Sequence, residues 1–275
     1  MNEEYEWRSH RSVLDIISNG IGDLRSGFSL WPVWTRVAWA DIRRETRRTL
    51  VGIWWYPLSL GLTVLALGYV FGGLMNIPSY DMYPHLAAGL GLWGLITGSI
   101  VNGANVFISR AGVIQERALP LSFHVYRLMF RIVLETVMKL SVFGAAVILV
   151  GRPITWLMLY AIPGFFALAI IGTCVAFILS IFGTRFRDTI QFLPPVMLLA
   201  FLLSPVLWRP TDLPNNSFLT LYNPFAHALA VVRDPLMGQL PSSLTVFFIS
   251  GMVLVGLVCS VVAFSFLKDK VVFWV

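Results

Sequence analysis

Long, continuous runs of apolar residues are the feature that most restricts how this chain can fold. A helix that crosses a bilayer needs about 20 mostly apolar residues, and within lipid only helices and closed barrels satisfy all backbone hydrogen bonds. The runs here are too long and too continuous to be barrel strands. The sequence therefore predicts an all-α integral membrane protein with six transmembrane helices, at about 53–75, 85–108, 128–150, 154–182, 190–208 and 244–267.

The composition indicates the same class. Hydrophobic residues make up 57% of the 275 residues and charged residues only 12%, whereas an average soluble domain is about 25% charged. This balance excludes a disordered chain, which needs low hydrophobicity and high charge, and an ordinary soluble enzyme. A net charge of +6 would suit nucleic acid, but its position along the chain points to the membrane, and we expect no nucleic-acid partner.

Lysine and arginine are concentrated in alternate connections between the apolar runs. Fifteen of them fall in residues 1–52, 109–127 and 183–189 and in the tail after 267, whereas only three, Arg152, Arg209 and Arg233, fall on the other side. Positively charged loops stay in the cytoplasm. The bias predicts that both termini are cytoplasmic, as an even number of spans also requires, with residues 1–30 forming a cytoplasmic N-terminal tail.

Two connections are predicted to carry helices of their own. In 31–52, tryptophan and apolar side chains fall on one side of a helical projection and five arginines on the other, which is typical of an amphipathic helix in the membrane interface. In 209–243, the stretch Pro224 to Met237 is apolar but too short to span. We expect short re-entrant or interfacial external helices there, between spans five and six; a lid that only covers the bundle is the alternative.

The sequence lacks the motifs of catalysis and of metal or nucleotide binding. No G-x-x-x-x-G-K-[ST] loop occurs, and none of Lys139, Lys268 and Lys270 follows a glycine. There is no H-E-x-x-H and no C-x-x-C, and the four histidines are scattered. We therefore expect no catalytic residue, no metal site and no cofactor in this chain.

One group of charges lies inside a predicted span. Arg131, Glu135 and Lys139 follow one another at intervals of four residues, so they share one face of a helix. Ionisable residues at membrane depth usually face a bundle interior or a water-filled path. The three form either a self-neutralising structural ladder or part of a conduit, and the spacing does not decide between these.

Five segments, taken in order along the chain, form a recognisable arrangement. Segment 40–59 reads ADIRRETRRTLVGIWWYPLS, in which the matching positions are Asp41, Ile42, Leu50, Gly52, Trp55 and Pro57. The others lie at 107–127, 185–208, 221–234 and 268–275. Together they resemble the permeases of type 2 ABC exporters (ABC-2) for surface polysaccharides. A departure is Glu45–Thr46, where that family often has a tyrosine, so the role of this position is open.

The resemblance implies a transmembrane domain at 31–275 that pairs with itself as a homodimer and forms the channel. It also implies two copies of a separate ABC ATPase subunit, which would supply ATP and Mg²⁺. The complex would export a polyprenyl-pyrophosphate-linked polysaccharide, of O-antigen or capsule type, across the bacterial inner membrane. By this analogy 31–52 is a gate helix, 209–243 is the external gate segment, and 109–127 is a coupling loop that contacts the ATPase through Gln115, Glu116, Arg117 and Pro120.

The basic residues of 31–52 suit a lipid pyrophosphate. All of them are arginine, and guanidinium groups bind phosphate bidentately, which lysine cannot do. We therefore expect the pyrophosphate to be bound by Arg43, Arg44, Arg47 and Arg48. The alternative is that these arginines pair with bulk anionic lipid or with acidic residues of the ATPase.

Aromatic residues near the membrane boundaries are candidates for lining a glycan channel, because their rings pack on the apolar faces of sugars. They are Trp54, Trp55 and Tyr56 at the inner boundary and Phe201, Trp208, Tyr222 and Phe225 at the outer one. An ordinary interfacial aromatic belt explains the same positions. Two other functions stay open: an ABC permease for a drug or a lipid, and a membrane-embedded sugar transferase. The lack of catalytic clusters counts against the transferase, and the arginine and tryptophan entry helix favours the polysaccharide exporter.

Overall fold

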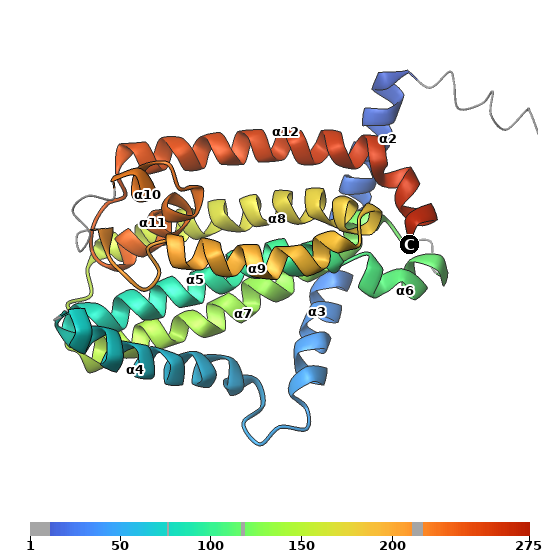
Figure 1. Cartoon of the computed structure of the whole chain (residues 1–275). Coiled ribbons are helices and arrows are strands. Elements are labelled where there is room, and N and C mark those ends of the chain that lie inside the picture. The colour runs from blue at the N-terminus through green and yellow to red at the C-terminus, as the bar shows by residue number, and fades with distance from the viewer. Residues whose placement is uncertain (1–11, 76, 117–118, 211–216) are drawn as a thin grey trace, which may run out of the picture.

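The computed structural model describes residues 12–75, 77–116, 119–210 and 217–275, and these ranges contain eleven α-helices and no strand (Figure 1). Five helical segments are long and apolar enough to cross a membrane. Their helices are α4 (Trp55–Met75, preceded by the 3₁₀ turn η1, Gly52–Trp54), α5 (Ser79–Asn105), α7 (Leu121–Leu149), α8 (Ala161–Arg185, preceded by η3, Trp156–Tyr160) and α12 (Ser243–Trp274). The chain is therefore an all-helical, multi-pass membrane protein.

The predicted fifth span is shorter than expected. Helix α9 covers Asp188–Leu203 only, 16 residues, or about 24 Å at 1.5 Å per residue. It ends because Ser204, with ψ of 149°, is extended, as a residue before a proline prefers to be. In Figure 1, α9 runs along the bundle beside α5 and α8 and returns the chain to the far end. That six helices cross the membrane stays a prediction.

Two helices lie across one end of the bundle, α2 (Val13–Ser29) and α3 (Trp31–Thr46) (Figure 1). Sequence analysis assigned no element to 13–29. Helix α2 begins with a capping box between Ser12 and Asp15, and Asp23 accepts hydrogen bonds from the backbone N–H and hydroxyl of Ser122 at 3.1 and 2.7 Å. The C-terminal end of α12 lies at this same end, where Lys268 donates to the carbonyl oxygen of Asn19 at 2.7 Å.

The opposite end carries α10 (Ser217–Leu221) and α11 (Pro224–Leu236). The helical stretch predicted from Pro224 to Met237 is present and ends one residue earlier. Asn223 caps it by accepting from the backbone N–H of Phe225 at 2.9 Å, and Pro224 occupies its first turn, where no N–H is needed. Helix α11 packs against α5, α8 and α12.

Glycines allow α5 and α8 to pack closely, as small residues do between membrane helices. A Cβ atom added at Gly183 would lie 2.1 Å from the carbonyl oxygen of Ala104, and one at Gly103 would lie 2.9 Å from the Cα of Ala176. The backbones of the two helices therefore touch at these points, which fixes their crossing.

We expect Gly183→Ala to lower the free energy of unfolding by about 1–3 kcal/mol, because the new methyl group overlaps backbone atoms that cannot move independently. The measurement is the melting temperature of the purified protein in detergent. Gly144→Ala is the control, since a Cβ there meets nothing within 4 Å. Equal melting temperatures for the two variants would contradict the close crossing.

Candidate functional site

Helix α3 packs on α7 through one apolar face. Ala38 and Ile42 on this face are fully buried, and Thr46 is nearly so. Arg43 and Arg44 lie on exposed positions of the same helix. The packing therefore turns the arginines of α3 away from the bundle.

The predicted helix 31–52 is too long by six residues, because α3 ends at Thr46. Thr49 replaces the helical hydrogen bonds: its hydroxyl donates to the carbonyl oxygen of Thr46 at 2.9 Å and accepts from the N–H of Gly52 at 3.1 Å. Gly52 has a φ of +62°, a conformation that favours glycine. Arg47 and Arg48 consequently lie in a turn rather than on a helix.

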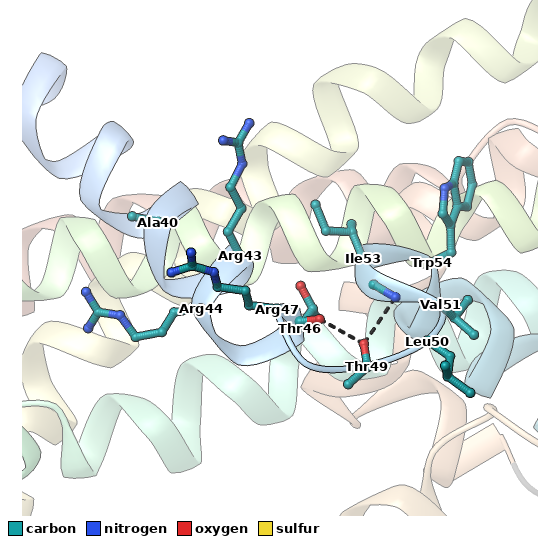
Figure 2. Close-up of a pocket in the computed structure, with 11 residues that line it drawn as sticks. Ala40, Arg43, Arg44, Thr46, Arg47, Thr49, Leu50, Val51, Ile53 and Trp54 are labelled. Atoms are coloured by element: carbon teal, nitrogen blue, oxygen red, sulfur yellow. Dashed lines mark hydrogen bonds between the residues drawn. The ribbon is translucent and has the colours of Figure 1, made fainter.

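A groove of about 890 Å³ lies between the end of α3 and this turn (Figure 2). Figure 2 shows Arg43, Arg44 and Arg47 on the α3 side of the groove and Trp54 on the other side. Within the described ranges none of the three arginines forms an ion pair. We call this the arginine groove. The fourth predicted arginine, Arg48, does not line it.

The acidic residues of α3 are already paired. Asp41 accepts hydrogen bonds from Nε and Nη2 of Arg127 on α7 at 2.8 and 2.7 Å, and Arg110 lies 3.7 Å from it. Burial, and then the charge of Arg127, lower the pKa of the Arg110 guanidinium. Glu45 pairs with Arg131 of α7 at 2.5 Å and accepts from the hydroxyl of Tyr56 at 2.9 Å. Both carboxylates are therefore paired with arginines of α7, and the arginine groove keeps its positive charge.

Comparison of the sequence with models of known protein families identifies the family of this chain. The sequence model of the ABC-2 type transporters matches residues 33–237, about three quarters of the chain. The chain belongs to the ABC-2 type transporter family. As an ABC-2 subunit it is a membrane component of an ABC transporter, with a role in transport rather than catalysis, and such subunits normally work with an ATPase partner. No curated protein matches the chain.

In this ABC-2 subunit the three charges predicted inside a span are not a symmetrical ladder. Arg131 donates to Glu135 at 2.7 Å, so this pair is present, and Arg131 has a second carboxylate in Glu45. Lys139 has no ion pair among the described residues. It lies in a cavity of about 390 Å³ between α5 and α7 with Thr97, whose buried hydroxyl has no hydrogen-bond partner there.

Two neighbouring cavities lie along α5 and α7, and we call them together the polar groove. The cavity at Lys139 and a second one of about 410 Å³, next to Asp41 and Arg127, share the residues Asn102, Ile132 and Glu135. The groove therefore extends from the α3 end of the bundle to one turn of α7 beyond Glu135. Sequence analysis predicted the α7 charges but not the α5 side chains beside them.

The predicted coupling loop 109–127 is shorter in the ABC-2 subunit, because α7 begins at Leu121, directly after Pro120 in an extended conformation. The rest holds a 3₁₀ turn, Ile108–Arg110, and the six-residue helix α6, Ala111–Glu116. Gln115 and Glu116 are exposed, and Arg117 lies outside the described residues. In Figure 1, α6 lies at the same end as α2 and α3.

The predicted aromatic residues fall into separate environments. Trp54 and Trp55 are 70% and 53% exposed, and Tyr56 is bonded to Glu45. At the opposite end, Phe201 and Phe225 both pack on Trp93, with ring centroids 5.5 and 5.7 Å away. Trp208 is buried and Tyr222 is exposed. Within one subunit the structure does not bring them onto one surface.

We expect Asp41→Asn to destabilise the protein by about 3 kcal/mol, because it leaves Arg127 largely buried without its carboxylate. Asp188→Asn is the matched control, since Asp188 is exposed and outside the ion pairs above. Thermal unfolding in detergent measures both. If Arg127→Gln and the double variant are added, a coupling energy near zero would show that the pair contributes nothing.

Proposed function

We propose that this ABC-2 subunit is the permease of an exporter that moves a polyprenyl-pyrophosphate-linked polysaccharide across the bacterial inner membrane. The observation that carries the proposal is the arginine groove. Three guanidinium groups without carboxylate partners lie next to an exposed tryptophan, at the end of the bundle where the first span begins. A pyrophosphate concentrates negative charge, and guanidinium groups bind it bidentately.

The position of Trp55 suits the sugars that follow the pyrophosphate. Its ring is exposed and lies just beyond the arginines in the chain, so a glycan leaving the phosphate site would meet it first. Trp54 is exposed as well, but it also lines an apolar groove between α4 and α7. Phe201, Trp208 and Phe225 are packed inside the subunit, and their use by a glycan would need a rearrangement. We therefore assign the first sugar contact to Trp55 alone.

The polar groove along α5 and α7 supports a homodimer. Lys139 lies well inside a span, and a charged side chain facing hydrocarbon is costly. A second copy of the chain covering the groove would instead enclose a water-filled path, lined by Thr97, Asn102 and Glu135 as well. On this proposal the charges of α7 line the conduit. Two ATPase subunits would contact α6 through Gln115 and Glu116, with Pro120 setting the start of α7.

We expect lysine in place of Arg43, Arg44 and Arg47, singly and together, to reduce export progressively, because the charge is kept while the bidentate geometry is lost. The measurements are surface glycan in cells and stimulation of ATPase activity by lipid-linked glycan in the reconstituted complex. Arg36→Lys is the control, since Arg36 is exposed on the same helix but does not line the groove. Undiminished export and stimulation in the triple variant would refute the pyrophosphate site. An ABC-2 permease for an uncharged drug would give that result.

We also expect the α2–α3 end to be cytoplasmic. In a variant in which Cys174 and Cys259 are replaced by alanine, Ser79→Cys should react with an impermeant maleimide added to intact cells, and Ser12→Cys should react only after lysis. The reason is the excess of arginine at the α2–α3 end. The reverse pattern of labelling would overturn this orientation.

A further inference from the structure

A second groove, of about 600 Å³, runs between α4 and α7 and is almost entirely apolar. Its α4 side extends from Trp54 to Leu65, about 16 Å at 1.5 Å per residue. Small residues keep it open: a Cβ added at Gly61 would meet only Val142, at 3.9 Å, and Ala145 lies on the α7 side. Leu58, Leu62 and Leu65 along it are between 43% and 59% exposed.

The apolar groove lies next to the arginine groove. Val51 and Trp54 line both of them, and Trp54 stands at the edge of the arginine groove in Figure 2. Two adjacent grooves therefore present three guanidinium groups on one side of Val51 and Trp54 and apolar side chains of a membrane span on the other. This order of chemistry matches an amphiphile with an anionic head and a long apolar chain.

We propose that the two grooves together bind the lipid carrier of the cargo, with its phosphate groups among Arg43, Arg44 and Arg47 and its hydrocarbon chain between α4 and α7. The inference rests on the proposed function, to which it adds a site for the lipid tail. It commits to the carrier lipid rather than bulk phospholipid, because three arginines without carboxylate partners match the charge of a diphosphate better than that of a single phosphodiester. The carrier is then held by the subunit before export begins.

The tail site and the polar groove lie on different sides of α7. The α4 groove uses Ser141, Val142 and Ala145 of α7, whereas the polar groove uses Ile132, Glu135, Thr136 and Lys139. Tyr56 of α4 links the two sides by donating a hydrogen bond to Glu45, the partner of Arg131. Sugars could therefore enter the polar groove while the tail stays in contact with lipid.

The test uses the complete transporter, with its ATPase subunits, reconstituted in liposomes, and a polyprenyl diphosphate with a photoreactive group in its chain. We expect crosslinked peptides from 54–65 and 141–150, and competition by unlabelled polyprenyl diphosphate but not by phosphatidylglycerol. Gly61→Leu should lower crosslinking about tenfold, because the leucine fills the groove. Gly144→Leu is the matched control on α7. A Cβ added at Gly144 meets nothing within 4 Å, and Gly144 does not line the groove. Equal melting temperatures would establish that both variants fold.

Three results would overturn the inference. Crosslinking of α4 and α7 that Gly61→Leu leaves unchanged would place the chain elsewhere. Equal competition by phosphatidylglycerol would make the groove a site for bulk membrane lipid. Crosslinks confined to other helices, but lost when the three arginines become lysine, would remove the tail site and leave the proposed function intact. If the arginine variants also export normally and the probe crosslinks nowhere, the proposed function fails as well.

Discussion

Two carboxylates on α3 determine how the rest of the α3 end is arranged. Asp41 and Glu45 are four residues apart, as are their partners Arg127 and Arg131 on α7, so two ion pairs hold the helices in one register. Because these pairs use the acidic residues of α3, its arginines are left without carboxylates and face outward. The positive groove is thus a consequence of pairing on the opposite side of the helix. Without those pairs, the same arginines would have nearby acids to neutralise them.

The membrane-spanning segments could be predicted from the sequence because burial in lipid requires length and apolarity, and both are local properties. The error at α9 also has a local cause. Ser204 and Pro205 end the helix, although the apolar residues Val206 and Leu207 continue the run. Hydropathy measures how apolar a segment is, whereas the extended backbone conformation favoured before a proline determines where a helix stops. The apolar run is therefore longer than the helix at this point.

The site was predicted less completely, since it depends on contacts between distant segments. The arginines of 31–52 were identified from their side-chain chemistry, and three of the four line one groove. Their outward direction depends on Asp41 and Arg127, which are 86 positions apart, and no local pattern reveals that pairing. Likewise, no local pattern in the sequence reveals that Thr97 of α5 lies beside Lys139 of α7. The threonine hydroxyls that end α3 at Thr46 give a local signal, which the helical projection of 31–52 ignored.

Helices α2 and α3 are joined by a single residue, Leu30, and α2 is attached to the last helix of the chain. Gly20 lies against Ser265, where an added Cβ would come within 2.7 Å of backbone, and Lys268 bonds to Asn19. A displacement of α12 would therefore move α2 and, through a linker too short to absorb it, α3. The final helix lies outside the family match, yet it is connected through α2 to the helix that carries Arg43 and Arg44. Helices α12, α2 and α3 therefore form one connected group at one end of the bundle, although α2 and α12 are separated by more than 200 residues in the chain.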